Sequence, residues 1–103
     1  MTPTEPTITL NAARQQFELM TDGKRSLVAF FRPDDHTLAL THTEVDPALE
    51  GRGIGSNLVK QVLTYAEQHN QKIVPLCPFV AAYIKRHPDW QRIVSTEYGE
   101  ADF

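Results

Sequence analysis

The chain has 103 residues, of which 41% are hydrophobic, and this length and composition are typical of one soluble globular domain with a single core. Its formal net charge of −3 argues against general binding to nucleic acids or anionic membranes. No apolar stretch is long enough to span a membrane, and the polar start is unlike a signal or transit peptide. A single cysteine excludes an internal disulfide, so we expect a reducing, cytoplasmic compartment.

The first half of the chain predicts strands joined by turns. After a loose tail expected at residues 1–7, four extended segments follow: residues 8–10, 16–20, 26–32 and 37–45. Turn residues at 21–24 and 33–36 join the last three as an antiparallel meander. Segment 26–32 is apolar on both faces, so we expect a central strand covered on both sides. Alternation places four side chains on one face of the last segment: Leu38, Leu40, His42 and Glu44.

The second half predicts a helix, a strand and a second, shorter helix. Apolar residues at spacings of three and four predict the first helix at residues 56–69. A short strand is expected at 72–76, and Pro78 and Pro88 mark the start and the end of the second helix. A strand, a crossover helix and a strand in this order favour parallel pairing between the third and fourth strands.

The predicted fold is a single α/β (α+β) domain spanning residues 1–103, built on a compact mixed sheet. A three-stranded antiparallel meander is followed by a helix, a parallel strand and a second short helix. Residues 89–94 are expected to fold back onto this core with Trp90 and Ile93 as anchors, and residues 97–103 to form a loose tail.

Glycines at positions 51, 53 and 55 separate the third strand from the first helix. A strand, a glycine loop and a helix start offer backbone N–H groups and the positive end of a helix dipole to an anion, usually a phosphate. The loop is neither a dinucleotide fingerprint nor a Walker loop, because Ser56 and Asn57 follow Gly55. A plain turn before the helix is the alternative interpretation.

Cys77 stands where the last strand ends and the second helix begins. A helix dipole stabilises a thiolate at such a position, which favours a reactive thiol. The alternative is a small buried side chain without chemistry.

Three further side chains carry acid–base chemistry: His42, Glu44 and Tyr83. His42 and Glu44 lead directly into the glycine loop, where either one could take a proton; alternatively, they form a pair that only fixes the loop. Tyr83 lies on the apolar stripe of the second helix and either protonates a leaving thiolate or packs in the core. No His-Glu-x-x-His motif and no paired cysteines occur, so we expect no metal site.

The run from Glu50 to Gly55, between a strand and an amphipathic helix, resembles the acetyl-CoA-binding core of the GCN5-related N-acetyltransferases. The signature of that superfamily is Arg/Gln-x-x-Gly-x-Gly/Ala. Three segments also resemble a small subfamily that includes bacterial YjdJ-type proteins and the eukaryotic N-acetyltransferase domain-containing protein 1: residues 42–45, 75–80 and 83–88. The resemblance covers residues 17–93.

This resemblance implies an acetyl-CoA-dependent N-acetyltransferase that acts on an unidentified amine, either a small molecule or a protein. Loop amides of the superfamily bind the pyrophosphate of coenzyme A, and the preceding strand holds the pantetheine arm through main-chain atoms. The matching positions here are Thr43, Glu44, Val45, Arg52, Gly53, Ile54, Gly55 and Ser56. Tyr83 matches the acid for the departing thiolate, and Cys77 matches a catalytic or acetyl-accepting residue proposed for the subfamily.

The expected partners are therefore acetyl-CoA and an amine, with no metal, nucleic acid or membrane, and the chain is expected to be a monomer or a weak dimer. Glu50 departs from the signature, and a carboxylate beside a pyrophosphate predicts weaker binding. Only residues 21–25 are available where larger members insert two helices that shape the acceptor pocket, so we expect an open acceptor side. The alternatives are a CoA- or acyl-CoA-binding regulatory domain without turnover and a plain interaction module.

Overall fold

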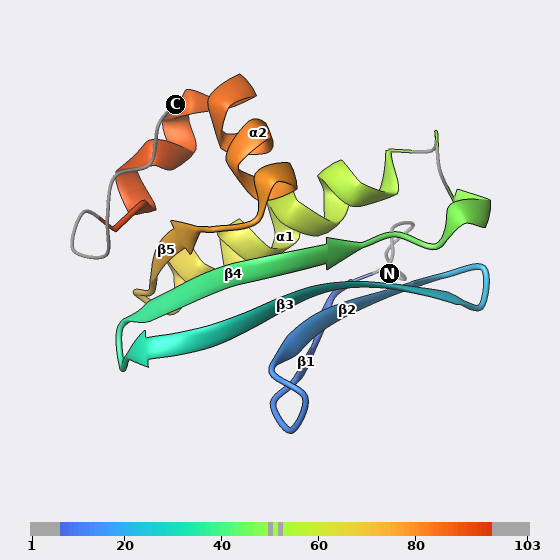
Figure 1. Cartoon of the computed structure of the whole chain (residues 1–103), viewed down its shortest axis with the longest axis horizontal. Helices are drawn as coiled ribbons and strands as arrows, with labels where there is room; N and C mark the ends of the chain where they lie inside the picture. Colours follow the sequence, from blue (N-terminus) through green and yellow to red (C-terminus); the bar gives the residue numbers. More distant parts are fainter. Residues whose placement is uncertain (1–6, 50, 52, 96–103) are drawn as a thin grey trace, which may run out of the picture.

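A five-stranded mixed sheet forms one layer, and helices α1 and α2 cover one of its faces (Figure 1). The strands are β1 (Thr9–Asn11), β2 (Gln16–Thr21), β3 (Lys24–Asp34), β4 (Thr37–Glu44) and β5 (Lys72–Pro75). The helices are α1 (Ile54–Gln68), α2 (Pro78–Arg86) and the short 3-10 helices η1 (Pro47–Leu49) and η2 (Pro88–Ile93). This computed structural model describes residues 7–49, 51 and 53–95. The tails predicted at 1–7 and 97–103, apart from residue 7, lie outside the described residues, as do Glu50 and Arg52.

The strand order β1-β2-β3-β4-β5 confirms the predicted topology. Strands β1, β2, β3 and β4 pair antiparallel, each with the next, in a meander. Strand β5 follows the α1 crossover and pairs in parallel with β4. Asp22 and Gly23 form the β2–β3 turn with φ of 52° and 76°, the left-handed values that a tight hairpin requires. The fold is therefore the mixed α/β arrangement that the sequence predicts.

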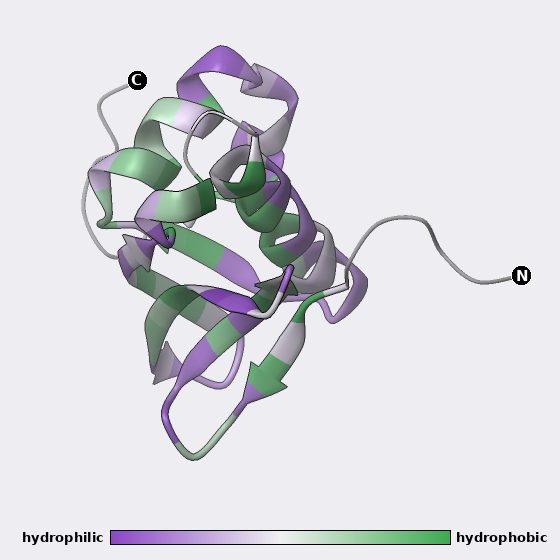
Figure 2. Cartoon of the chain, turned by 90° about the vertical axis from the view of Figure 1, so that its right-hand side faces the viewer, coloured by the Kyte–Doolittle hydropathy of each residue, from purple (hydrophilic) through white to green (hydrophobic). Residues whose placement is uncertain are grey.

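The hydrophobic core lies between the sheet and α1. Phe17 on β2 contacts Phe30 on β3 and Tyr65 on α1, with ring centroids 5.0 and 5.1 Å apart. The buried side of α1 carries its apolar stripe: Leu58, Val59, Val62, Leu63 and Ala66. Hydrophobic and hydrophilic residues alternate along the strand ribbons in Figure 2. Because the helices of residues 7–49, 51 and 53–95 pack against one face of the sheet, the period-two pattern fixes which side chains enter the core.

The expectation that β3 is covered on both sides was wrong. Ser26, Val28 and Phe30 are buried towards α1, whereas Phe31 on the opposite face is 44% exposed. The reason is that α1 and α2 lie on one face of the sheet, so no helix of the described residues covers the other face of β3.

The expectation that Leu38, Leu40, His42 and Glu44 share one face of β4 was also wrong. Leu40 pairs with Phe30, but His42 pairs with Ala29, so Thr41 is an extra residue in the β4 strand. Such a β-bulge inverts the alternation beyond it. Leu38 and Leu40 therefore lie on the helix-covered face, while His42 and Glu44 lie on the opposite one.

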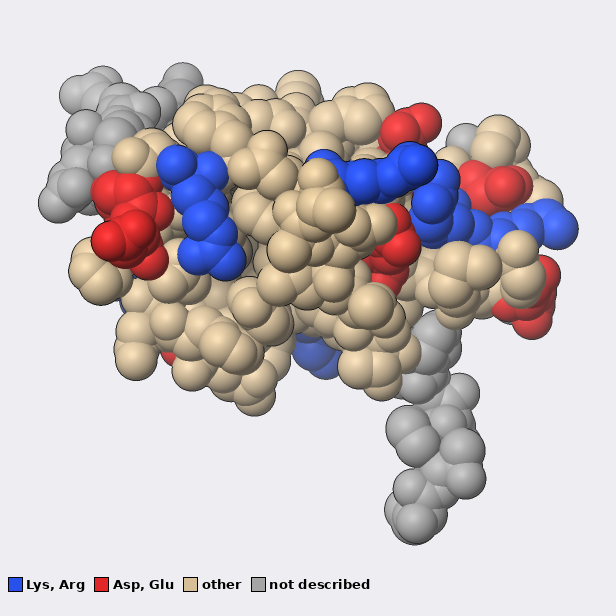
Figure 3. Space-filling view, turned by 90° about the horizontal axis from the view of Figure 1, so that it is seen from below, with Lys and Arg blue, Asp and Glu red and all other residues tan. Residues whose placement is uncertain are grey.

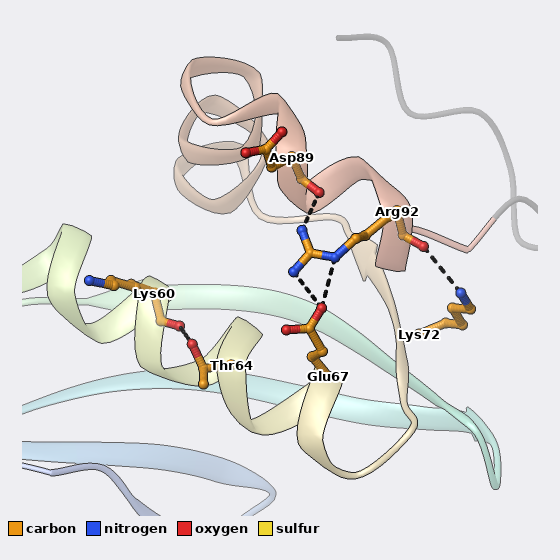
Figure 4. A network of polar contacts seen from close by, with 6 residues as sticks. All are labelled: Lys60, Thr64, Glu67, Lys72, Asp89 and Arg92. Carbon is orange, nitrogen blue, oxygen red and sulfur yellow. Dashed lines mark hydrogen bonds and ion pairs between the residues drawn. The ribbon is translucent and has the colours of Figure 1, made fainter.

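The segment after α2 folds back as the sequence predicts (Figure 4). Ile93 is buried in the core, and Trp90 packs against it as a partly buried side chain. The Arg92 guanidinium pairs with the Glu67 carboxylate on α1, and the Lys72 ammonium donates to the Arg92 carbonyl over 3.2 Å. These contacts fasten η2 to the end of α1 and to β5.

Leu63 lies in the middle of α1 with 0% exposure. Replacing it with alanine leaves a cavity in a filled core, which lowers the free energy of unfolding by about 2–5 kcal/mol. Met20 on β2 is 52% exposed, so Met20→Ala is the matched control, with an expected loss below about 0.5 kcal/mol. Urea unfolding followed by circular dichroism measures both losses; equal losses would contradict the burial assigned to Leu63.

Candidate functional site

A cavity of about 620 Å³ lies where β4 ends and where α1 and α2 begin. Eleven described residues line it: Thr43, Glu44, Val45, Pro47, Leu49, Gly51, Gly53, Ile54, Gly55, Ser56 and Phe79. Seven of the eight positions that match coenzyme-binding residues are in this set, including Glu44, which is also a predicted catalytic residue. The eighth, Arg52, lies outside the described residues.

The first turn of α1 forms one wall of this cavity. Gly53 is the N-cap residue with φ 72°, and it has no side chain that could accept a hydrogen bond from the turn. The first intrahelical bond runs from the Asn57 amide to the Gly53 carbonyl over 3.1 Å. The amides of Ile54, Gly55 and Ser56 have no acceptor within the helix, as at every helix start. These donors and the positive end of the helix dipole favour an anion at this wall.

Gly55 allows α2 to pack closely against the start of α1. A Cβ atom at this position would lie 2.6 Å from Cζ of Phe79 and 3.3 Å from Cγ2 of Val45. The missing side chain therefore lets the Phe79 ring rest on the helix start, where it lines the cavity and stays 39% exposed. We did not predict Phe79 as a site residue; its position two residues after Cys77 was the available signal.

Strands β4 and β5 separate at the inner end of the site. Their pairing ends at Leu40 and Pro75, and the Cys77 amide then donates to the Leu40 carbonyl over 2.9 Å. Beyond this bond β4 continues to Glu44, whereas the chain after Cys77 turns away into α2. The last β4 residues therefore face a gap instead of a neighbouring strand.

Cys77 lies at this point of separation as the N-cap residue of α2. Its side chain is 5% exposed, and Sγ lies 3.3 Å from Oγ1 of Thr43, which lines the cavity. Cys77 itself is not among the lining residues. The structure thus brings the predicted thiol next to the cavity wall, behind one threonine side chain.

His42 and Glu44 lie next to each other on the sheet face away from α1. Their side chains are 60% and 63% exposed, and His42 Nε2 lies 3.4 Å from Glu44 Oε2. Glu44 also lines the cavity, but His42 does not. Figure 3 shows the underside of the molecule, where acidic and basic side chains are interspersed and neither sign dominates.

Tyr83 is 5% exposed and is not among the residues that line the cavity. Burial raises the pKa of its hydroxyl above the ordinary value of 10.0, and a hydrogen bond with Trp90 and the nearby Arg86 charge oppose that rise. Its ring packs on His87 at a centroid distance of 4.4 Å. The hydroxyl is therefore protonated at neutral pH, and its described partner lies in η2.

Within the described residues, no group of three or more His, Cys, Asp or Glu side chains is placed to hold a metal ion. Among the same residues, no helix has the length and apolar character needed to cross a membrane.

The raised pKa of Tyr83 predicts a pH dependence of stability. The unfolded chain ionises this tyrosine first as the pH rises past 10.0, so the stability due to the buried neutral hydroxyl is lost above that pH. Between about pH 8 and about pH 11, we expect the unfolding free energy of the wild type to fall by more than that of Tyr83→Phe. Urea unfolding at both pH values measures both falls; equal falls would contradict the assigned environment.

Comparisons with known proteins identify the family. A model of the GCN5-related N-acetyl-transferase family matches residues 16–93. Protein NATD1 of Xenopus tropicalis is 30% identical over 77 residues, which cover 73% of this chain and 71% of that protein. Protein NATD1 of Mus musculus is also 30% identical, over 73% of this chain and 70% of that protein.

The fold comparison agrees with the family match. The NMR solution structure of a GCN5-like protein from Staphylococcus aureus superimposes with a TM-score of 0.66, covering 95% of this chain and 99% of that chain. The two sequences are 20% identical, so this likeness concerns the fold. The resemblance that the sequence motifs carry is confirmed, and the chain belongs to the GCN5-related N-acetyltransferase family.

Proposed function

We propose that this protein is an acetyl-CoA-dependent N-acetyltransferase that binds its co-substrate in the cavity between β4, α1 and α2. The observation that carries this proposal is the start of α1, where Ile54, Gly55 and Ser56 line the cavity beside the end of β4. Family membership supports acetyl-CoA as the ligand.

The residues present fit the parts of coenzyme A. The amides at the start of α1 would hold the pyrophosphate, because this helix end offers both N–H donors and a positive partial charge. Thr43 and Val45 would hold the pantetheine arm through main-chain atoms along the free end of β4. The thioester would then lie towards the gap where β4 and β5 separate, next to Cys77.

The transfer requires little more than positioning, because the thioester is already activated. The attacking amine forms a C–N bond to the carbonyl carbon, the bond to the coenzyme sulfur breaks, and the amine proton must leave. Glu44 could accept this proton because it lines the cavity, and His42 pairs with it. The family resemblance assigns Tyr83 as the acid for the departing thiolate, a role that requires its hydroxyl to leave Trp90 and reach the cavity.

A coenzyme-A-binding regulatory domain without turnover is the second candidate. The observation that favours it is the position of Tyr83, whose hydroxyl has Trp90 as a partner and does not line the cavity. Both candidates require coenzyme binding, so only an acetyl-transfer assay over a broad panel of small amines and lysine peptides separates them. Acetyl transfer to any member of the panel would exclude a regulatory domain without turnover.

Calorimetry with acetyl-CoA, CoA and ATP tests the binding site. We expect both CoA species to bind, and Ser56→Glu to weaken their binding by at least about tenfold, because it places a carboxylate among the α1 amides. Glutamate in the first turn is compatible with the helix dipole, so this variant should fold.

Gln68→Glu is the matched control for that charge change. It adds the same charge at the last residue of α1, about 18 Å along the helix axis, and we expect affinity within about twofold of the wild type. Indifference of the wild type to both CoA species would refute the proposal.

Mass spectrometry after mixing with acetyl-CoA tests a covalent role of Cys77. In that route Sγ forms a bond to the carbonyl carbon, the bond to the coenzyme sulfur breaks, and the thiol proton leaves on CoA. If transfer takes this covalent route, the wild type carries an acetyl adduct that Cys77→Ala lacks. If no adduct forms and Cys77→Ala keeps full transfer activity, the amine attacks the thioester directly.

A further inference from the structure

We propose that the Thr43 hydroxyl is the positioning group for the Cys77 thiol, holding its sulfur towards the cavity. This inference deepens the proposed function and rests on it, because it assumes that the thioester lies in that cavity. Thr43 would thus contribute through its side chain as well as through main-chain contacts to the pantetheine arm.

The contact geometry links the thiol to the cavity through Thr43. Oγ1 of Thr43 lies 3.3 Å from Sγ of Cys77, within hydrogen-bond range for sulfur. Thr43 lines the cavity, whereas Cys77 is 5% exposed and does not. Within the described part of the chain, Thr43 makes the one side-chain hydrogen bond to this sulfur.

The β-bulge at Thr41 explains why the Thr43 side chain points towards Cys77. Thr43 pairs with Val28, whose buried side chain faces α1, and partners across an antiparallel pair share a face. Without the extra residue, regular alternation from Leu40 would place Thr43 on the opposite face. Bulges often redirect a side chain next to an active site, and this one brings a hydroxyl to the thiol.

The main chain at Cys77 is held by hydrogen bonds, so the sulfur can change position only by rotation of the side chain. The Cys77 amide donates to the Leu40 carbonyl over 2.9 Å, and its own carbonyl accepts from the Ala81 amide over 3.0 Å. The backbone is therefore fixed by the end of the sheet on one side and by α2 on the other. Thr43 is β-branched and stiff about its first torsion, so its hydroxyl is a defined anchor for the sulfur.

The chemistry of the hydroxyl suits both states of the sulfur. A threonine hydroxyl has one donor and two acceptor positions, so it accepts from the thiol and donates to the ionised sulfur. The bond to the ionised sulfur is the stronger of the two, because charge assists it. The thiolate is the nucleophile in thiol chemistry, so removing the hydroxyl should slow reactions at Cys77.

Alkylation by iodoacetamide at neutral pH tests this role, because Cys77 is the one cysteine of the chain and a single mass increase reports on it. Thr43→Val keeps the shape and removes the hydroxyl; we expect alkylation roughly tenfold slower than in the wild type. Thr43→Ser keeps the hydroxyl, and we expect a rate within about threefold of the wild type, because the loss of one methyl group leaves the oxygen in place.

Two outcomes would overturn the inference: Thr43→Val alkylating at the wild-type rate, or Thr43→Ser being as slow as Thr43→Val. Alkylation in urea should be equal for all variants, which checks that the difference arises in the folded state. If Thr43→Val does not fold, Thr43→Ala compared with Thr43→Ser isolates the same oxygen. The assay needs no coenzyme, so the two failures are distinguishable: a protein that fails to bind acetyl-CoA but shows the expected rates would refute the proposed function, and only the effect of Thr43 on the reactivity of the Cys77 thiol would remain.

Discussion

The hydrogen bond from the Cys77 amide to the Leu40 carbonyl is where β4 and β5 stop running side by side, and the candidate site depends on this separation. A parallel pair that continued to Glu44 would fill the gap with ladder hydrogen bonds. Here Pro75 contributes no amide to the ladder and Pro78 begins α2, so β5 ends early. The free end of β4 becomes a cavity wall as a result.

The start of α1 is the second part of the site, and the core of the protein holds it in place. Gly51 and Gly53 have φ of 83° and 72°, conformations that residues with a side chain rarely adopt. Behind them the apolar stripe of α1 is buried against the sheet, which fixes the helix axis. The donors of the first turn are therefore fixed in orientation, so under the proposed function they would not need to reorganise when the pyrophosphate binds.

The helices α1 and α2 cover one face of the sheet, and side chains on the other face are exposed. Phe31 and Met20 are exposed where a second layer would cover them, and His42 and Glu44 lie on the same side of the sheet as Phe31. Under the proposed function, an amine would reach His42 and Glu44 from that side without passing α1 or α2. Under the proposed function, acceptor choice would then depend on a shallow surface near Glu44 more than on an enclosed pocket.

The sequence by itself determined the features that arise from local periodicity and turn chemistry. The strand alternation in residues 16–20, the hairpin at Asp22 and Gly23, the amphipathic α1 and the proline-bounded α2 were all predictable, because each signal lies within a few adjacent residues. The motif around Gly53 and Gly55 likewise indicates the family from the sequence alone.

Only the tertiary structure decided how these elements meet. The bulge at Thr41 arises from pairing with β3 and reverses the side-chain alternation, so the sequence alone placed His42 and Glu44 on the wrong face. The contact between Thr43 and Cys77 joins residues 34 positions apart, and the packing of Phe79 on Gly55 joins two helix starts. The physical reason is that register between strands and packing between helices are set by partners distant in the chain, which a local pattern does not contain.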